Sequence, residues 1–208
     1  MQLNFAGDFT LELHQTAETM SLARKATLVF MICLLTPDCR AEDSHAPIPI
    51  AHRGLLRHAP ENTLPAFSTC LDLGMGFELD IRTTKDGHLV VIHDETIERT
   101  TSSKSRFIQD MTLFEVQQLD AGGWFDPAFT GVRIPTLEET LALIKKRRRS
   151  PTIIALNVKQ LTSDGESRLV ELVDKYGLFE ESFAFDQDIE TSKRLQAIDA
   201  RFRIGQNV

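Results

Sequence analysis

The sequence predicts an α/β protein with a parallel sheet. From residue 48 onward, short apolar runs alternate with helical patterns, which is typical of βα units. The chain has 208 residues, of which 42% are hydrophobic and 25% charged, a composition typical of one globular domain. We therefore expect a single layered domain over residues 42–208.

Six short apolar runs are expected to be strands. They lie at 48–52, 77–82, 89–94, 152–158, 182–186 and 202–207. The runs between them have an apolar face at helical spacing and predict helices. These helices lie at 62–74, 136–149, 166–177 and 188–198. Gly74 marks the end of the first helix, and Asp86-Gly87 between the second and third strands is a signal for a two-residue hairpin loop.

Residues 95–133 interrupt this alternation and predict a small insertion after the third strand. The segment contains a short helical pattern at 113–119 and a run rich in glycine and aromatic residues. Trp124 and Phe125 either cover a pocket or pack the insertion internally. The basic run at 145–149 ends a predicted helix, where positive charge complements the helix dipole. That role is favoured over an anionic membrane patch.

The amino-terminal region predicts an export signal. Reading from Met20, two positive residues precede the apolar run 26–35, and a small residue stands at Ala41. We therefore expect a signal peptide at 20–41, cleavage near Ala41 and a secreted or periplasmic mature protein. Residues 1–19 then form a spurious extension upstream of the true start. The alternative is that 26–35 is a short buried helix of the domain.

Charge and cysteine content exclude several classes of protein. The net charge of −7 argues against nucleic-acid binding, and three cysteines cannot form a disulfide framework. No run reaches the roughly 18 apolar residues of a membrane span, so no stable span is expected in the mature chain. Nothing in the sequence determines the oligomeric state.

Polar side chains gather where the predicted strands end. His52 and Arg53 follow the first strand and His93 ends the third. Because the carboxyl ends of parallel strands meet at one edge, these groups are expected to share one mouth. Two histidines suit acid and base roles near neutral pH, and an arginine fork suits a phosphate, although a structural ion pair is the commoner role of arginine.

Glu78 and Asp80 stand two residues apart in the second strand and therefore share one face. Two carboxylates on one face are suited to a hard cation such as Ca²⁺ or Mg²⁺. The alternative is an exposed edge strand with solvated acids.

These residues belong to a series of motifs that resembles a known family. The runs IAHRG, PENTLPAF, GFELDIRTTKDGHLVVIHDETIERTT, DAGGWF and GVRIPTLEETL occur in the order typical of glycerophosphodiester phosphodiesterases. The resemblance covers about residues 50–159. It implies a TIM (β/α)₈-type barrel, a bound Ca²⁺ or Mg²⁺, and hydrolysis of small-molecule glycerophosphodiesters to sn-glycerol 3-phosphate and an alcohol.

The resemblance also implies a role for each matching residue. His52 and His93 match the family's acid/base pair, and Arg53 matches its phosphate-binding arginine. The first two metal ligands fall on Glu78 and Asp80. The remaining matches concern substrate binding. Lys159 matches a lysine that neutralises the phosphate, and Glu61 and Asn62 match residues that shape the mouth and contact the metal or the glycerol end of the substrate.

The sequence departs from the family in two ways. Asn157 stands where the third metal carboxylate is expected, and Asp186 is a candidate replacement ligand, with an N-cap role as its alternative. The chain also shows about six of the eight βα units of a closed barrel, so we expect an incomplete barrel. About two further units would be encoded beyond Val208, or a second copy would complete the sheet.

The departures leave other functions open. One is a non-catalytic relative that binds a phosphate or sugar phosphate without turnover. Another is a phosphodiesterase that acts on lysophospholipid or sphingolipid substrates. Metal-dependent turnover of glycerophosphocholine would separate the enzyme from the binding protein.

Overall fold

The computed structural model describes residues 49–149, 152–185 and 189–205. The segment expected to be the signal peptide and its upstream extension lie outside the described residues, and so does Asp186. All described residues belong to one compact unit, Pro47–Val208. Within them, no helix has the length and apolar character that crossing a bilayer requires.

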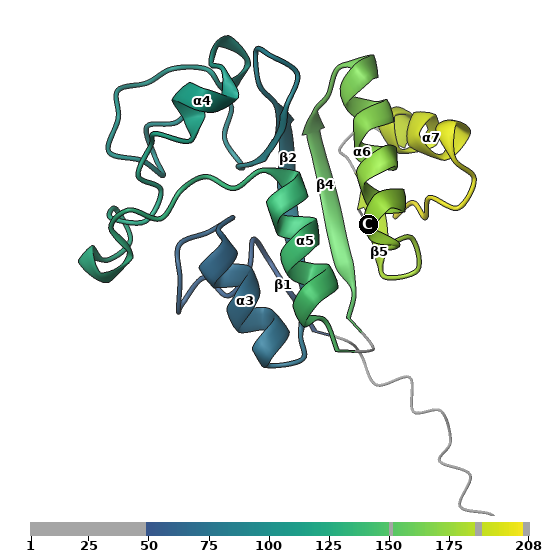
Figure 1. Ribbon diagram of the computed structural model, residues 1–208, viewed down its shortest axis with the longest axis horizontal. Coiled ribbons are helices and arrows are strands. Elements are labelled where there is room, and N and C mark those ends of the chain that lie inside the picture. The colour runs from purple at the N-terminus through teal and green to yellow at the C-terminus, as the bar shows by residue number, and fades with distance from the viewer. Residues whose placement is uncertain (1–48, 150–151, 186–188, 206–208) are drawn as a thin grey trace, which may run out of the picture. The chain divides into compact units, whose positions relative to one another are not determined.

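A parallel sheet with the order β1-β2-β4-β5 forms the centre of the fold. Its strands are β1 (Ile50–Ala51), β2 (Gly76–Thr83), β4 (Ile154–Gln160) and β5 (Ser182–Phe185). Its helices are α3 (Leu64–Asp72), α5 (Leu137–Arg147), α6 (Ser163–Tyr176) and α7 (Ile189–Ile198). Each helix contacts the next, as Figure 1 shows. This winding confirms the α/β prediction and matches part of a barrel.

The third expected strand is not part of the parallel series. β3 (Leu89–Val91) pairs antiparallel with β2, with Thr83 opposite Leu89. The Thr84 N–H donates to the His88 carbonyl at 2.9 Å, so the loop holds three residues rather than two, and Gly87 has φ +82. A short loop returns the chain antiparallel, whereas a parallel neighbour needs a crossover of about a dozen residues.

Of the six expected strands, the third therefore adds no unit to the parallel series, although the described fold still corresponds to part of a barrel. The last expected strand contributes one parallel bridge, between Ala184 and Ile204. Within the described residues, the parallel sheet thus has four strands, and a single bridge at Ile204 marks where a fifth would pair with β5. β3 extends the sheet as an antiparallel partner of β2.

Helix ends follow the signals in the sequence. α5 begins with a capping box, in which Thr136 and Glu139 each bond the other's backbone N–H. α6 begins at an N-cap threonine and ends at Gly177, whose φ of +61 is a conformation that glycine adopts without strain. The basic run ends α5 as predicted, and Arg147 there pairs with Asp72 on α3 at 2.5 Å.

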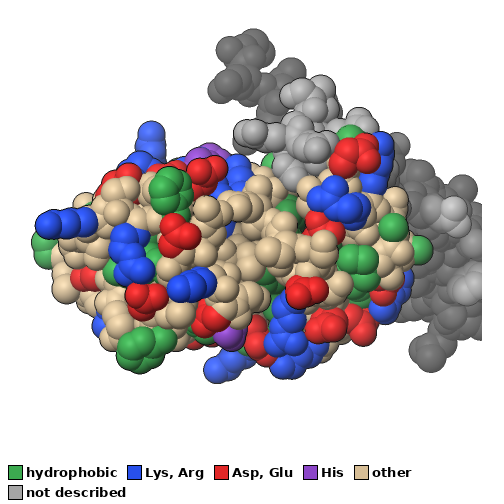
Figure 2. Space-filling model, turned by 90° about the horizontal axis from the view of Figure 1, so that it is seen from above, with side chains coloured by type: hydrophobic (Ala, Val, Ile, Leu, Met, Phe, Trp, Pro, Cys, Tyr) green, Lys and Arg blue, Asp and Glu red, His purple; other side chains and the backbone are tan. Residues whose placement is uncertain are grey.

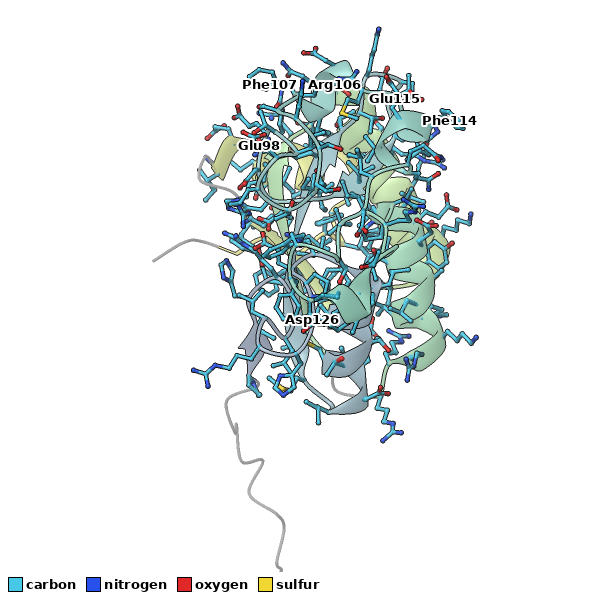
Figure 3. The ribbon with its side chains drawn as sticks, turned by 90° about the vertical axis from the view of Figure 1, so that its left-hand side faces the viewer. Glu98, Arg106, Phe107, Phe114, Glu115 and Asp126 are labelled. Carbon is cyan, nitrogen blue, oxygen red and sulfur yellow. The ribbon has the colours of Figure 1, made fainter. Side chains whose placement is uncertain are left out.

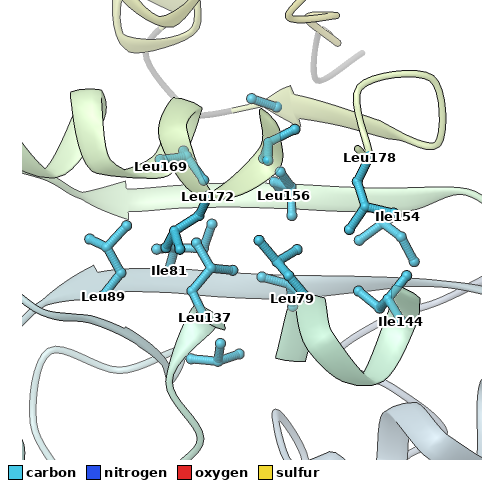
Figure 4. Packing of buried hydrophobic residues seen from close by; sticks show 14 of the residues in the cluster. Leu79, Ile81, Leu89, Leu137, Ile144, Ile154, Leu156, Leu169, Leu172 and Leu178 are labelled. Atoms are coloured by element: carbon cyan, nitrogen blue, oxygen red, sulfur yellow. The ribbon is translucent and has the colours of Figure 1, made fainter. Parts of the chain in front are cut away.

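The two faces of β2 have different chemistry, although every residue of the strand is buried. Phe77, Leu79 and Ile81 are fully buried in the main core, which packs the helices onto the sheet (Figure 4). The alternate residues Glu78 and Asp80 point to the opposite face. The burial of β2 excludes the alternative of an exposed edge strand.

The insertion forms a second core. Its apolar centre contains Val90, Ile92, Ile97, Ile108, Met111, Val116, Ala121 and Ile134. Its short helices are η1 (Ile108–Asp110), α4 (Leu113–Val116) and η2 (Pro127–Phe129). The insertion lies toward the carboxyl end of β4 (Figure 1). Its outer side carries Phe107 and Phe114, which are 47% and 73% exposed (Figure 3).

Trp124 packs within the insertion. Its indole N–H donates to the Ala121 carbonyl at 2.9 Å, and its ring meets Phe125 edge-on at 5.9 Å. Phe125 in turn meets Phe129 edge-on. These contacts support the packing alternative for the aromatic pair.

Candidate active site

The carboxylates Glu78 and Asp80 form the buried centre of the site. Their residues are 5% and 0% exposed. Asn157 on the neighbouring strand β4 lies opposite Asp80 in the register. Its Nδ2 donates to Glu78 Oε1 at 3.1 Å and to Asp80 Oδ1 at 3.0 Å. The structure thus brings three of the four expected ligand residues together on one face of the sheet.

Burial and mutual repulsion oppose the double negative charge of this pair. Burial, and then the charge of Asp80, raises the pKa of Glu78 to about 7. Two cations partly compensate: Lys159 Nζ lies 3.4 Å from Asp80 Oδ1, and Arg53 Nε lies 3.6 Å from Asp80 Oδ2. Both expected phosphate-binding cations therefore sit beside the carboxylates.

The loops after β1 and before α3 are tied together at the site. Arg53 and Asn62 have φ values of +55 and +54, which are uncommon for residues other than glycine. The Asn62 backbone N–H donates to the Arg53 carbonyl at 3.0 Å, and the Arg53 N–H donates to Glu78 at 2.8 Å. Left-handed backbone in residues that carry a site is a form of strain that the surrounding hydrogen bonds hold in place.

Glu61 and Asn62 both lie at this mouth. Asn62 Nδ2 donates to Asp80 at 2.8 Å. Glu61 pairs with Arg53 at 3.2 Å and is held further by Arg99. Burial opposes ionisation of Glu61, but the hydrogen bonds and charge of Arg99 and Arg53 outweigh it and lower its pKa.

The two histidines lie near each other at the mouth. Partial burial, and then the charge of Arg53, lowers the pKa of His52, which follows β1, and this favours the neutral ring. The pKa of His52 is also raised by the charge of Asp80 and lowered by that of His93. His93 Nδ1 lies 2.6 Å from Asp94 Oδ1. A neutral ring and a ring oriented by a carboxylate are suited to proton transfer.

Three residues around His93 were not predicted from the sequence. Arg82 Nε donates to the His93 carbonyl at 2.9 Å. Asp94 accepts from Arg99 through both carboxylate oxygens. Burial would raise the pKa of Asp94, but hydrogen bonds from Arg99 and His93 outweigh it and lower it to about 2. The sequence signal was the position of Asp94 and Arg99 inside the motif that contains His93.

The structure gathers nine of the ten expected site residues. They are His52, Arg53, Glu61, Asn62, Glu78, Asp80, His93, Asn157 and Lys159. Asp186 lies outside the described residues, so its role stays a prediction. Among the described residues, no group of three or more His, Cys, Asp and Glu side chains could hold a metal ion. The third position beside the carboxylate pair is the Asn157 amide.

The surface toward which β4 points carries charges of both signs. Figure 2 views the molecule from this side, and acidic and basic side chains are interspersed over its described part. This distribution suits a small charged ligand better than an extended polyanion.

Comparison with known proteins agrees with this geometry. The glycerophosphoryl diester phosphodiesterase family matches residues 52–204. A glycerophosphodiester phosphodiesterase of Caldanaerobacter subterraneus is 45% identical over 136 residues, which are 64% of this chain and 54% of the relative. The chain therefore spans about half the length of that curated relative.

Solved structures show the same fold. A glycerophosphodiester phosphodiesterase of Agrobacterium tumefaciens is 35% identical with a TM-score of 0.68, over 76% of this chain and 65% of that one. An Oleispira antarctica phosphodiesterase, solved with the product sn-glycerol-3-phosphate, is 27% identical with a TM-score of 0.66, over 78% of this chain and 66% of that one. The described sheet and helices are thus part of a barrel fold.

Proposed function

This chain belongs to the glycerophosphoryl diester phosphodiesterase family, and we propose that it hydrolyses glycerophosphodiesters to sn-glycerol 3-phosphate and an alcohol. One observation carries the proposal. Two cations lie beside Asp80 in a buried pair of carboxylates, Glu78 and Asp80, and two neighbouring histidines lie at the same mouth. The same site then supplies groups that bind a phosphodiester and groups that move its protons.

Arg53 and Lys159 would hold the phosphate of the substrate. Both lie beside Asp80, and the buried Nε of Arg53 has no hydrogen-bond partner in the described structure. A buried donor without a partner is costly, and a phosphate oxygen is a strong acceptor for it. The two cations would also offset the charge that develops on the phosphate during the reaction.

A divalent cation, Ca²⁺ or Mg²⁺, is the proposed cofactor. Members of this family generally depend on such a cation. The donor set fits a divalent cation. Its positive charge would offset the repulsion between the two buried carboxylates, and rotation of the Asn157 amide would present its oxygen as a third ligand. A bound cation would polarise a phosphoryl oxygen. Phosphate binding and proton transfer are carried out by side chains of the protein itself.

His52 and His93 would divide the proton transfers. One takes a proton from the nucleophile, either water or a neighbouring hydroxyl of the substrate, as the new bond to phosphorus forms. The other gives a proton to the oxygen of the alcohol as its bond to phosphorus breaks. The ring of His93 is already oriented by Asp94 at 2.6 Å.

The test is hydrolysis of glycerophosphocholine by the purified protein with Ca²⁺, Mg²⁺ or a chelator. We expect metal-dependent release of choline, and its loss in His52→Ala and in His93→Ala. His58→Ala is the matched control, because His58 is an exposed histidine whose backbone N–H donates to the Leu55 carbonyl at 2.9 Å. Equal activity in all three variants would refute the two-histidine mechanism.

A second candidate is a non-catalytic protein that binds a phosphate or sugar phosphate. Asn157 favours it, because the amide already satisfies both carboxylates through hydrogen bonds and carries no charge for a cation. Binding of sn-glycerol 3-phosphate without turnover under any metal condition would support this candidate over the enzyme.

We also propose export of the protein, on the basis of residues 20–41. Fusion of these residues to a reporter enzyme in a bacterial host tests it. Reporter activity outside the inner membrane is expected, and retention in the cytoplasm would refute it.

A further inference from the structure

Arg99 lies in the loop after β3 and joins two parts of the site. Its Nη1 and Nη2 donate to the two oxygens of Glu61 at 2.9 and 2.7 Å. Its Nε and Nη2 donate to the two oxygens of Asp94, the second at 3.1 Å. One guanidinium therefore makes a two-pronged contact with each of two carboxylates, a geometry that a lysine cannot reproduce.

Each of these carboxylates contacts a group that the proposed reaction uses. Asp94 meets the His93 ring at Nδ1, and Glu61 accepts from the Arg53 guanidinium at 3.2 Å. Arg53, Glu61, Arg99 and Asp94 follow one another in this network with alternating charge. The two negative charges of the carboxylates are therefore neutralised by the two arginines. Arg99 is the single link between the histidine and the phosphate-binding arginine in this series of contacts.

The network also determines which nitrogen of His93 carries the proton. The pKa of Asp94 is lowered to about 2, so at neutral pH its carboxylate accepts hydrogen bonds and donates none. At a separation of 2.6 Å, His93 Nδ1 must then be the donor. In the neutral ring, Nε2 is left as the nitrogen with a free lone pair for proton transfer.

We propose that Arg99 is a positioning residue that aligns His93 through Asp94 and Arg53 through Glu61. This inference rests on the proposed function, because it assigns Arg99 to the same site. It concerns a side chain that contacts neither the carboxylate pair nor the proposed phosphate cations directly. The insertion would thereby act on the chemistry of the barrel through one residue.

The experiment compares Arg99→Gln and Arg99→Lys with Arg106→Gln. Arg106 is a matched control, since it also lies in the insertion and donates twice to one carboxylate, that of Glu115, at 3.1 Å. Arg99 and Arg106 side chains are 43% and 48% exposed. Thermal unfolding of each variant establishes that it is folded, and Arg99→Lys preserves the charge if Arg99→Gln does not fold.

The first readout is independent of turnover. Ring ¹⁵N shifts of His93 report its tautomer, and we expect Nδ1–H in the wild type and in Arg106→Gln. In both Arg99 variants we expect a mixture of tautomers, because the Asp94 carboxylate stays ionised but is no longer held against Nδ1. An unchanged His93 tautomer in the folded Arg99 variants would overturn the proposal. If the wild type shows no turnover, the proposed function fails while this measurement still decides the role of Arg99.

The second readout is kinetic. We expect kcat for glycerophosphocholine to fall about 10- to 100-fold in both Arg99 variants, since misplacing a catalytic group is costly. Arg106→Gln should keep the wild-type kcat. A wild-type kcat in Arg99→Gln, or in Arg99→Lys, would show that the two-pronged contacts of Arg99 do not position the catalytic groups.

Discussion

Asn62 and Asp80 are joined by two hydrogen bonds that run in opposite directions. The Asn62 Nδ2 donates to the Asp80 carboxylate at 2.8 Å, and the Asp80 backbone N–H donates to the Asn62 Oδ1 at 3.2 Å. Both residues are buried. The loop before α3 is thereby attached to the centre of β2.

Replacing Asn62 should separate this attachment from the backbone strain beside it. Asn62→Gly loses both hydrogen bonds and leaves Asp80 partly unsatisfied, which should cost about 2–3 kcal/mol in the free energy of unfolding. Asn62→Ala should cost about 1 kcal/mol more, because alanine is strained at φ +54 and glycine is not. Urea unfolding of both variants measures the two contributions. Equal stability of the two would contradict the strain.

Gly54 should tolerate a methyl group less well than Gly131. Both have positive φ, +86 and +90, so alanine is strained at either position. A Cβ at Gly54 would meet the Ala66 Cβ of α3 at 2.7 Å, whereas nothing lies within 4 Å of one at Gly131.

We therefore expect Gly131→Ala to cost about 1–2 kcal/mol and Gly54→Ala about 1–3 kcal/mol beyond that. Chemical denaturation of the pair gives the difference directly. Similar losses in both would mean that α3 moves aside at little cost.

Adding a carboxylate at Asn157 should exchange stability for cation affinity. Asn157→Glu removes the amide that donates to Glu78 and Asp80 and adds a third buried negative charge. Without metal, we expect a loss of about 1–3 kcal/mol in the free energy of unfolding. Calorimetric titration should show tighter binding of Ca²⁺ or Mg²⁺, since affinity increases with ligand charge.

The control for this prediction is Gln160→Glu, which adds the same charge at an exposed position on β4. It should change neither stability nor cation affinity appreciably. A weaker cation affinity in Asn157→Glu than in the wild type would contradict the assigned site.

Asp94 should make stability depend on pH in the acidic range. Its pKa is about 2 in the folded protein, below the ordinary value of 3.8. The folded state therefore binds fewer protons than the unfolded state in this range. Ionised Asp94 stabilises the folded protein fully above about pH 4, and this stabilisation is lost as the pH falls toward 2. The difference in thermal stability between wild type and Asp94→Asn should shrink over that interval. A constant difference from pH 5 to pH 2 would contradict the lowered pKa.

Much of the site could be predicted because its residues lie at strand ends. Glu78 and Asp80 alternate with apolar residues in one strand, so their shared face follows from strand geometry alone. The direction of 89–94 depended on a separate signal, the Asp86-Gly87 pair, because the apolar run itself does not give the direction. An apolar run has the same pattern in a parallel and in an antiparallel strand, and only the short loop through Gly87 decides between them.

The contacts of Arg99 could not be predicted from the sequence either. Glu61 lies 38 residues before Arg99, and no periodic pattern connects a loop before one helix with a loop after a hairpin. Pairing between two irregular segments depends on the folded path of both. Asp94 is closer, five residues away, yet its two-pronged contact depends on the same path.

The alternation of β3 between two cores has a consequence for local opening. Leu89 and Val91 belong to the main core, whereas Val90 and Ile92 belong to the core of the insertion. Detachment of the insertion would expose one side of the strand while the other side stays packed. The backbone amide hydrogens of residues 89–92 would then exchange with solvent at rates set by the less stable of the two cores. His93 follows directly, and any such fluctuation would interrupt the alignment of its ring.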